Sequence, residues 1–90
     1  MSRLFPGERI FRHEVPVDDE WHSFRIVGNP LHVACRRLAV VEFWARANND
    51  PGVSRMFRVV GTGHLMPDAV TYWGTAVTAD LVWHLVERAS

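Results

Sequence analysis

The chain has 90 residues, of which ten are arginine, ten are acidic and none is lysine, so its formal net charge is zero. This length is that of one domain, and the hydrophobic content of 48% is far above the range of disordered chains. The balanced charge excludes bulk electrostatic attraction to nucleic acid or anionic membranes. The single cysteine, Cys35, excludes an intramolecular disulfide and a zinc site built from several cysteines.

We expect residues 1–90 to form a single domain that begins with a short arm, residues 1–8, in which Pro6 and Gly7 mark a turn. No basic and apolar leader begins the chain, and no apolar run approaches the ~20 residues that cross a bilayer. These observations predict a cytoplasmic protein.

The rest of the chain alternates between apolar and polar residues, which is the pattern of strands that are buried on one side. Turn residues separate the alternating segments, and the strongest turn is Asn48–Gly52. The predicted strands are Arg9–Val17, Trp21–Val27, Leu31–Arg37, Ala39–Asn48, Ser54–Gly61, Val70–Thr78 and Leu81–Arg88.

One of these segments, Ala39–Asn48, also fits a helix, because four of its apolar residues would then form one stripe. We favour a strand because the segment begins with β-branched residues and its neighbours are regularly spaced strands. As a strand it would bury Val41, Phe43, Ala45 and Ala47 and expose Val40, Glu42, Trp44 and Arg46.

About seven short strands and no clear helix indicate an all-β domain, either an antiparallel sandwich or a small barrel. Gly74 lies inside the sixth predicted strand, where glycine indicates a bulge or the close approach of another backbone.

The segment Gly61–Thr75 concentrates glycine, histidine, proline and aromatic residues, and a ligand-binding or enzymatic site at the mouth of a barrel would use His64, Asp68 and Tyr72. A histidine and a carboxylate on one loop could form an oriented acid–base pair. However, no serine, cysteine or second carboxylate stands at a diagnostic spacing, so we assign no catalytic residue. The simpler interpretation is that Asp68 pins the turn and His64 is a polar loop residue.

The five histidines are the candidate metal ligands, but none stands two residues from another, the usual spacing of ligands on a strand. A site assembled across strands, from His22 with His32 or from His13 with His84, stays open. We expect neither a metal nor a cofactor.

The aromatic residues point to an interface, because four tryptophans, five phenylalanines and one tyrosine exceed what one small core comfortably holds. Exposed tryptophan near arginine is typical of protein–protein hot spots, and it also serves as a stacking platform for sugars or bases. The alternative is that loops cover these rings. The predicted interface residues are Trp44, Arg46, Glu42 and Trp73, with Trp73 on the same side of its strand as Thr71 and Thr75.

The chain resembles a family of small uncharacterised proteins from actinobacteria and their bacteriophages. The resemblance rests on HEVPVDDEWH (His13–His22), LHVAC (Leu31–Cys35), VVEFWA (Val40–Ala45), GTGHLMPDAVTYWGT (Gly61–Thr75) and VWHLVE (Val82–Glu87). It covers most of the chain and implies a domain of unknown function in a phage or actinobacterial setting, with no catalytic residue to carry over.

The function that these observations favour is a non-enzymatic, self-associating protein-binding module, a homo-oligomer that also binds a host bacterial protein. If a phage encodes the chain, its location would be the host cytoplasm. We expect no membrane partner and no nucleic-acid partner. The first alternative is a virion or capsid accessory protein, and the second is a small-ligand-binding or enzymatic β-barrel with its site around His64 and Asp68.

Overall fold

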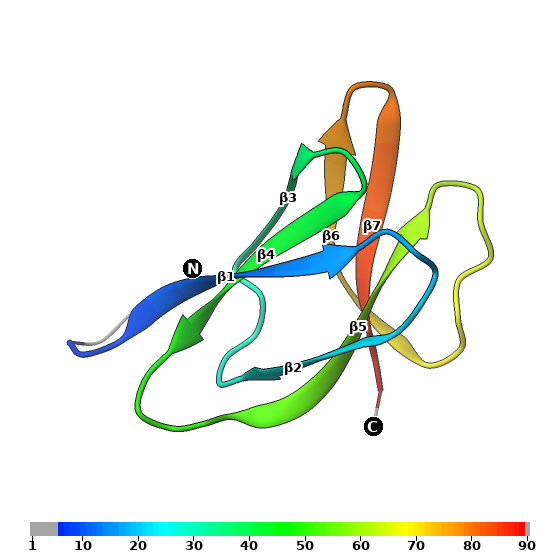
Figure 1. Cartoon of the computed structure of the whole chain (residues 1–90). Coiled ribbons are helices and arrows are strands. Elements are labelled where there is room, and N and C mark those ends of the chain that lie inside the picture. The colour runs from blue at the N-terminus through cyan, green and yellow to red at the C-terminus, as the bar shows by residue number, and fades with distance from the viewer. Residues whose placement is uncertain (1–5, 90) are drawn as a thin grey trace.

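The structure is a computed structural model that describes residues 6–89, and it consists of seven antiparallel strands in two sheets (Figure 1). The smaller sheet has the strand order β1-β4-β3 and the larger has the order β2-β5-β7-β6. The strands are β1 (Arg9–Pro16), β2 (His22–Ile26), β3 (His32–Arg37), β4 (Val40–Ala47), β5 (Val53–Gly61), β6 (Val70–Thr78) and β7 (Leu81–Arg88).

The predicted all-β sandwich is confirmed, and each strand begins and ends within one residue of its predicted bounds. The segment Ala39–Asn48 forms a strand rather than a helix. Of the predicted arm, Pro6 and Gly7 form the expected turn, whereas residues 1–5 lie outside the described part of the chain.

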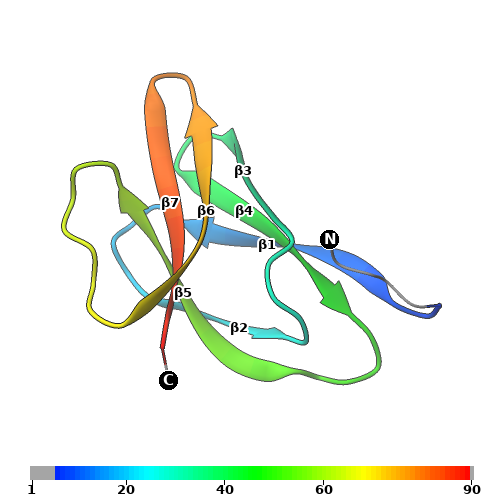
Figure 2. The same cartoon turned by 180° about the vertical axis from the view of Figure 1, so that it is seen from behind.

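The core lies between the two sheets. Figures 1 and 2 show the sheets from opposite sides. The rings of Phe24, Phe43 and Phe57 contact one another there, with centroids 4.7–6.0 Å apart. His13 stacks on Phe43 at 4.9 Å, and burial lowers the pKa of His13. The other core residues are Val15, Ile26, Cys35, Val41, Ala45, Val59, Ala76 and Leu85.

The chain passes from the smaller sheet to the larger one through the predicted turn Asn48–Gly52. Here the backbone N–H of Asp50 donates to Asn48 Oδ1 at 2.8 Å, and the N–H of Gly52 donates to Asp50 Oδ1 at 2.7 Å. Gly52 has a φ of +76°, and a Cβ at this position would lie 2.4 Å from the carbonyl oxygen of Ile26. Only glycine fits this backbone. The turn therefore lies where the sequence predicts it, and its residues adopt the turn conformations that they favour.

β6 contains a bulge, because Tyr72 pairs with Val86 of β7 while Gly74 pairs with the next residue, Leu85. The two sheets also approach each other closely at Gly74, since a Cβ on it would lie 2.9 Å from Cγ2 of Val33 in β3. The bulge expected at this glycine is confirmed, and the group that approaches Gly74 closely is a side chain rather than another backbone.

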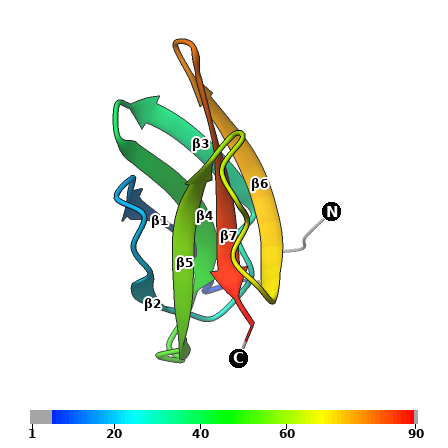
Figure 3. The same ribbon diagram turned by 90° about the vertical axis from the view of Figure 1, so that its right-hand side faces the viewer.

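The connection between β5 and β6, residues 62–69, runs along β7 from one end to the other (Figure 3). Its two ends are fixed by register, because Gly61 pairs with Trp83 and Val70 pairs with Arg88. β5 and β6 are therefore parallel to each other with β7 between them.

The close approach at Gly74 leads to a stability prediction. Gly74→Ala should lower the free energy of unfolding by about 1–3 kcal/mol, because the new methyl group overpacks the contact with Val33. Adding Val33→Ala should restore part of that loss, which a double-mutant cycle in urea denaturation measures.

Gly28→Ala is the matched control, because a Cβ there would lie 3.5 Å from the side chain of Arg46, an ordinary contact. Equal stability of Gly74→Ala and Gly28→Ala would show that the two sheets do not depend on the Gly74 contact.

Candidate functional site

Trp44 lies at the centre of the outer face of the smaller sheet, the surface opposite the core. In register, Arg12 of β1 and His32 of β3 are its direct neighbours on either side. The His32 ring lies 5.6 Å from the Trp44 ring, and Cζ of Arg36 lies 5.6 Å from the centroid of the indole. Trp44 is half-buried.

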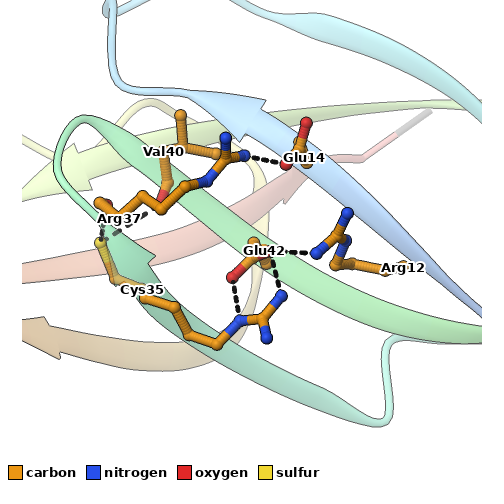
Figure 4. A network of polar contacts seen from close by, with 7 residues as sticks. Arg12, Glu14, Cys35, Arg37, Val40 and Glu42 are labelled. Carbon is orange, nitrogen blue, oxygen red and sulfur yellow. Dashed lines mark hydrogen bonds and ion pairs between the residues drawn. The ribbon is translucent and has the colours of Figure 1, made fainter.

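Glu42 lies on the same face, but its predicted exposure is wrong, because only 1% of this residue is accessible. Arg36 covers the carboxylate with two hydrogen bonds, from Nε at 2.8 Å and from Nη2 at 2.9 Å (Figure 4). Arg12 reaches it from β1, with Nη1 at 3.2 Å. The hydrogen bonds from Arg36 hold the pKa of Glu42 below its usual value, although burial acts in the opposite direction.

A second ion pair joins Arg37 to Glu14 beside this cluster (Figure 4). Below it, Cys35 Sγ donates to the carbonyl oxygens of Arg37 at 3.1 Å and Val40 at 3.2 Å. Burial raises the pKa of the Cys35 thiol, so the thiol acts here as a structural donor that ties the β3–β4 hairpin together.

These pairs leave the face with a surplus of positive charge. Glu14 balances Arg37, but the single carboxylate of Glu42 is shared by Arg12 and Arg36. We call this surface the Trp44 face and define it by Ile10, Arg12, Glu14, His32, Arg36, Arg37, Glu42, Trp44 and Arg46.

Arg46, another predicted interface residue, belongs to the Trp44 face and is half-buried. Its aliphatic stem lies against the backbone of Gly28, about 3.5 Å from where a Cβ would stand.

Trp73 does not belong to the Trp44 face. It packs against the core, and its Nε1 donates to Glu87 Oε1 at 2.8 Å, beside a bidentate ion pair between Glu87 and Arg55 at 2.6 Å. The expectation that Trp73 shares a side with Thr75 is wrong, because the bulge adds one residue between them and turns Thr75 outward.

The three residues of the predicted loop site are not brought together. The backbone N–H of His64 donates to the carbonyl oxygen of Gly61 at 3.1 Å, and its side chain and that of Asp68 are both exposed. No hydrogen bond or ion pair joins His64 to Asp68 in the described structure. Tyr72 faces a different histidine, His84 of β7, on the outer face of the larger sheet.

His84 is held between three hydroxyl groups. Thr62 Oγ1 donates to the carbonyl oxygen of Val82 at 3.2 Å and lies 2.9 Å from Nε2 of His84, which donates to it in the tautomer protonated at Nε2. Nδ1 of the neutral ring is then an acceptor, and the Tyr72 hydroxyl donates to it at 2.9 Å. The Tyr72 hydroxyl also bonds Thr75, whose Oγ1 lies 3.3 Å from Nδ1.

Sequence reasoning missed this cluster although it named Tyr72. Residues three apart on a regular strand face opposite sides, and only the bulge brings Tyr72 and Thr75 to the same side as His84. The one signal in the sequence was Gly74.

Across residues 6–89, no group of three or more His, Cys, Asp or Glu side chains is placed to hold a metal ion. A search of the same residues finds no helix that is long and apolar enough to cross a membrane.

Residues 6–90 match the model of a family described as a domain of unknown function, DUF7352. Neither the curated proteins nor the solved structures contain a match to the chain. The expected family of unknown function agrees with this match, while an actinobacterial or phage origin stays a prediction.

The pairing of Glu42 with Arg12 and Arg36 leads to a prediction for the stability of the protein and its pH dependence. Glu42→Gln should lower the free energy of unfolding at pH 7 by about 2 kcal/mol, because Arg12 and Arg36 lose the charge that neutralises them. Because the pKa of Glu42 is lowered on folding, its stabilisation is present above the unfolded value of about 4.5 and is lost as the pH falls through the folded value. The difference in stability between wild type and Glu42→Gln should therefore begin to narrow below pH 4.5 and continue to narrow toward the folded pKa, as thermal unfolding across pH measures.

Glu14→Gln is the matched control. Glu14 lies opposite Glu42 in register but is 44% exposed, so the loss of its pair with Arg37 should change stability little. A gap between wild type and Glu42→Gln that stays constant down to pH 3 would contradict the assignment.

Proposed function

We propose that this chain, which belongs to the DUF7352 family of domains of unknown function, is a non-enzymatic protein-binding module that binds its partner through the Trp44 face. The observation that carries the proposal is the position of Trp44, central on the face and held between His32 and Arg36. Tryptophan and arginine are the residues most enriched in binding hot spots. A ring already held in place loses less side-chain entropy when a partner covers it.

The charges of the Trp44 face favour a partner surface that carries carboxylates. Glu42 is buried beneath Arg12 and Arg36, so the groups that a partner would meet are the two guanidinium groups, which are 48% and 57% exposed. Such complementarity raises the association rate and selects the orientation of the partner.

Self-association is part of the proposal. Ile10 lies on the same face, opposite Arg46 in register, and is 45% exposed. A second copy that covers Ile10 and Trp44 would remove apolar surface from both chains at once, because a two-fold interface uses the same surface of each chain. A host protein is the second partner we propose, in line with the resemblance to phage and actinobacterial proteins.

A virion accessory role is the alternative, since the same face would serve to attach the chain to a particle. Its detection in purified particles decides between the two. A ligand-binding or enzymatic site around His64 and Asp68 has less support, because the loop holds these two side chains without a bond between them.

The test of self-association is light scattering on the purified chain. The wild type should have the mass of an oligomer, and Trp44→Ala should have the mass of a monomer, because the central ring of the interface is removed. Leu65→Ala is the matched control, since Leu65 is 96% exposed on the β5–β6 connection, and this variant should keep the wild-type mass. A wild type that is monomeric at all concentrations would remove self-association from the proposal.

The test of a second partner is affinity purification from an actinobacterial host, analysed by mass spectrometry. A host protein that is retained by wild type and Leu65→Ala but lost with Trp44→Ala would support binding through this face. Retention of the same proteins by all three chains would count against it.

A further inference from the structure

The outer face of the larger sheet carries a second arrangement of side chains, one that the proposed binding function does not use. Tyr72 of β6, His84 of β7 and Thr62 of the β5–β6 connection form a continuous hydrogen-bonded row. Tyr72 is the one tyrosine in the chain, and half of this residue is exposed.

The row has one direction in the tautomer of His84 that is protonated at Nε2. In this tautomer Tyr72 donates to Nδ1 of His84, Nε2 donates to Thr62, and Thr62 donates to a backbone carbonyl. A nucleophile that donates to a base, which is itself oriented by a third group, is the arrangement that activates hydroxyl nucleophiles in enzymes. In this row Tyr72 stands as the nucleophile, His84 as the base and Thr62 as the positioning residue.

We propose that Tyr72 is a site of covalent acylation, at which the phenol oxygen accepts an acyl group from an activated ester while His84 takes the phenol proton. The site lies on the sheet opposite the Trp44 face, so it does not depend on the proposed binding function.

The step balances without an oxidant or reductant. The oxygen of Tyr72 forms a bond to the acyl carbon, and the bond from that carbon to the leaving oxygen breaks, with the electron pair departing on the leaving group. The phenol proton moves to Nδ1 of His84 and then to the leaving group or water. The Nε2–H bond to Thr62 is retained throughout and holds the ring in place. The product is an ester of Tyr72.

Two features favour an acyl donor of low charge. While the imidazole is neutral, the cluster of Tyr72, Thr75, His84 and Thr62 carries no charge, which suits a neutral electrophile. A hollow of about 340 Å³ adjoins the cluster, and it shares Thr62 with the cluster in its lining. Leu81, Val82 and Trp83 also line it, and this part of the hollow fits a hydrocarbon group, while Gly61, His64 and Asp80 complete the lining.

The experiment uses p-nitrophenyl acetate as the probe. The wild-type chain should release about one equivalent of p-nitrophenolate in an initial burst, gain the mass of one acetyl group, and carry that group on Tyr72 by peptide mapping. The absence of lysine leaves few competing amines, which keeps the background of the assay low.

The variants separate the roles of the three residues. Tyr72→Phe should abolish the labelling, His84→Asn should slow it by at least about tenfold, and Thr62→Val should slow it less while the phenol and imidazole remain. His22→Asn is the matched control. His22 lies on β2, away from the cluster, and forms a hydrogen bond with Asp18, so this variant should keep the wild-type rate.

Circular dichroism of each variant shows whether it is folded. If His84→Asn does not fold, the labelling rate of Thr62→Val tests the proposal instead. Labelling of Tyr72 at the rate of free N-acetyltyrosinamide would overturn the proposal. Equal rates in the wild type and in the folded His84 or Thr62 variant, or acetyl groups found on other residues only, would overturn it as well.

Discussion

The side chain of Val33 packs closely against the backbone of Gly74, at one of the positions where β3 of one sheet meets β6 of the other. A strand can approach another this closely only at a residue without a side chain. The bulge that begins at the same position turns Trp73 into the core and Tyr72 and Thr75 toward His84. A close contact between the sheets and the composition of one outer surface are therefore both linked to the bulged segment of β6.

The two outer surfaces of the sandwich differ in the charge of their side chains. On the smaller sheet, the carboxylate of Glu42 is shielded from water by two arginines, so the surface around Trp44 is positive. On the larger sheet, the cluster at His84 is made of hydroxyl groups and an imidazole. The first arrangement suits contact with a large acidic surface, and the second suits chemistry at one atom.

The strands and the turn Asn48–Gly52 were predictable, because alternation and turn residues are local properties of the sequence. The order of strands in each sheet was not, since it depends on pairings between segments far apart in the chain. Glu42 shows the limit clearly: alternation places it on the outer side of β4, but its burial depends on Arg12 and Arg36 from neighbouring strands. Tyr72 was recognised as a candidate, whereas its partners followed only from the shifted register at Gly74.

The two tightest connections in the chain have a consequence for the route by which it folds. β3 and β4 are separated by two residues, as are β6 and β7, and each pair belongs to a different sheet. Such hairpins form within microseconds, whereas pairing β1 with β4 or β2 with β5 must close a long loop and is slower. Because one hairpin carries Val33 and the other carries Gly74, we expect their docking to be the nucleus of folding, with the first two strands of the chain joining last.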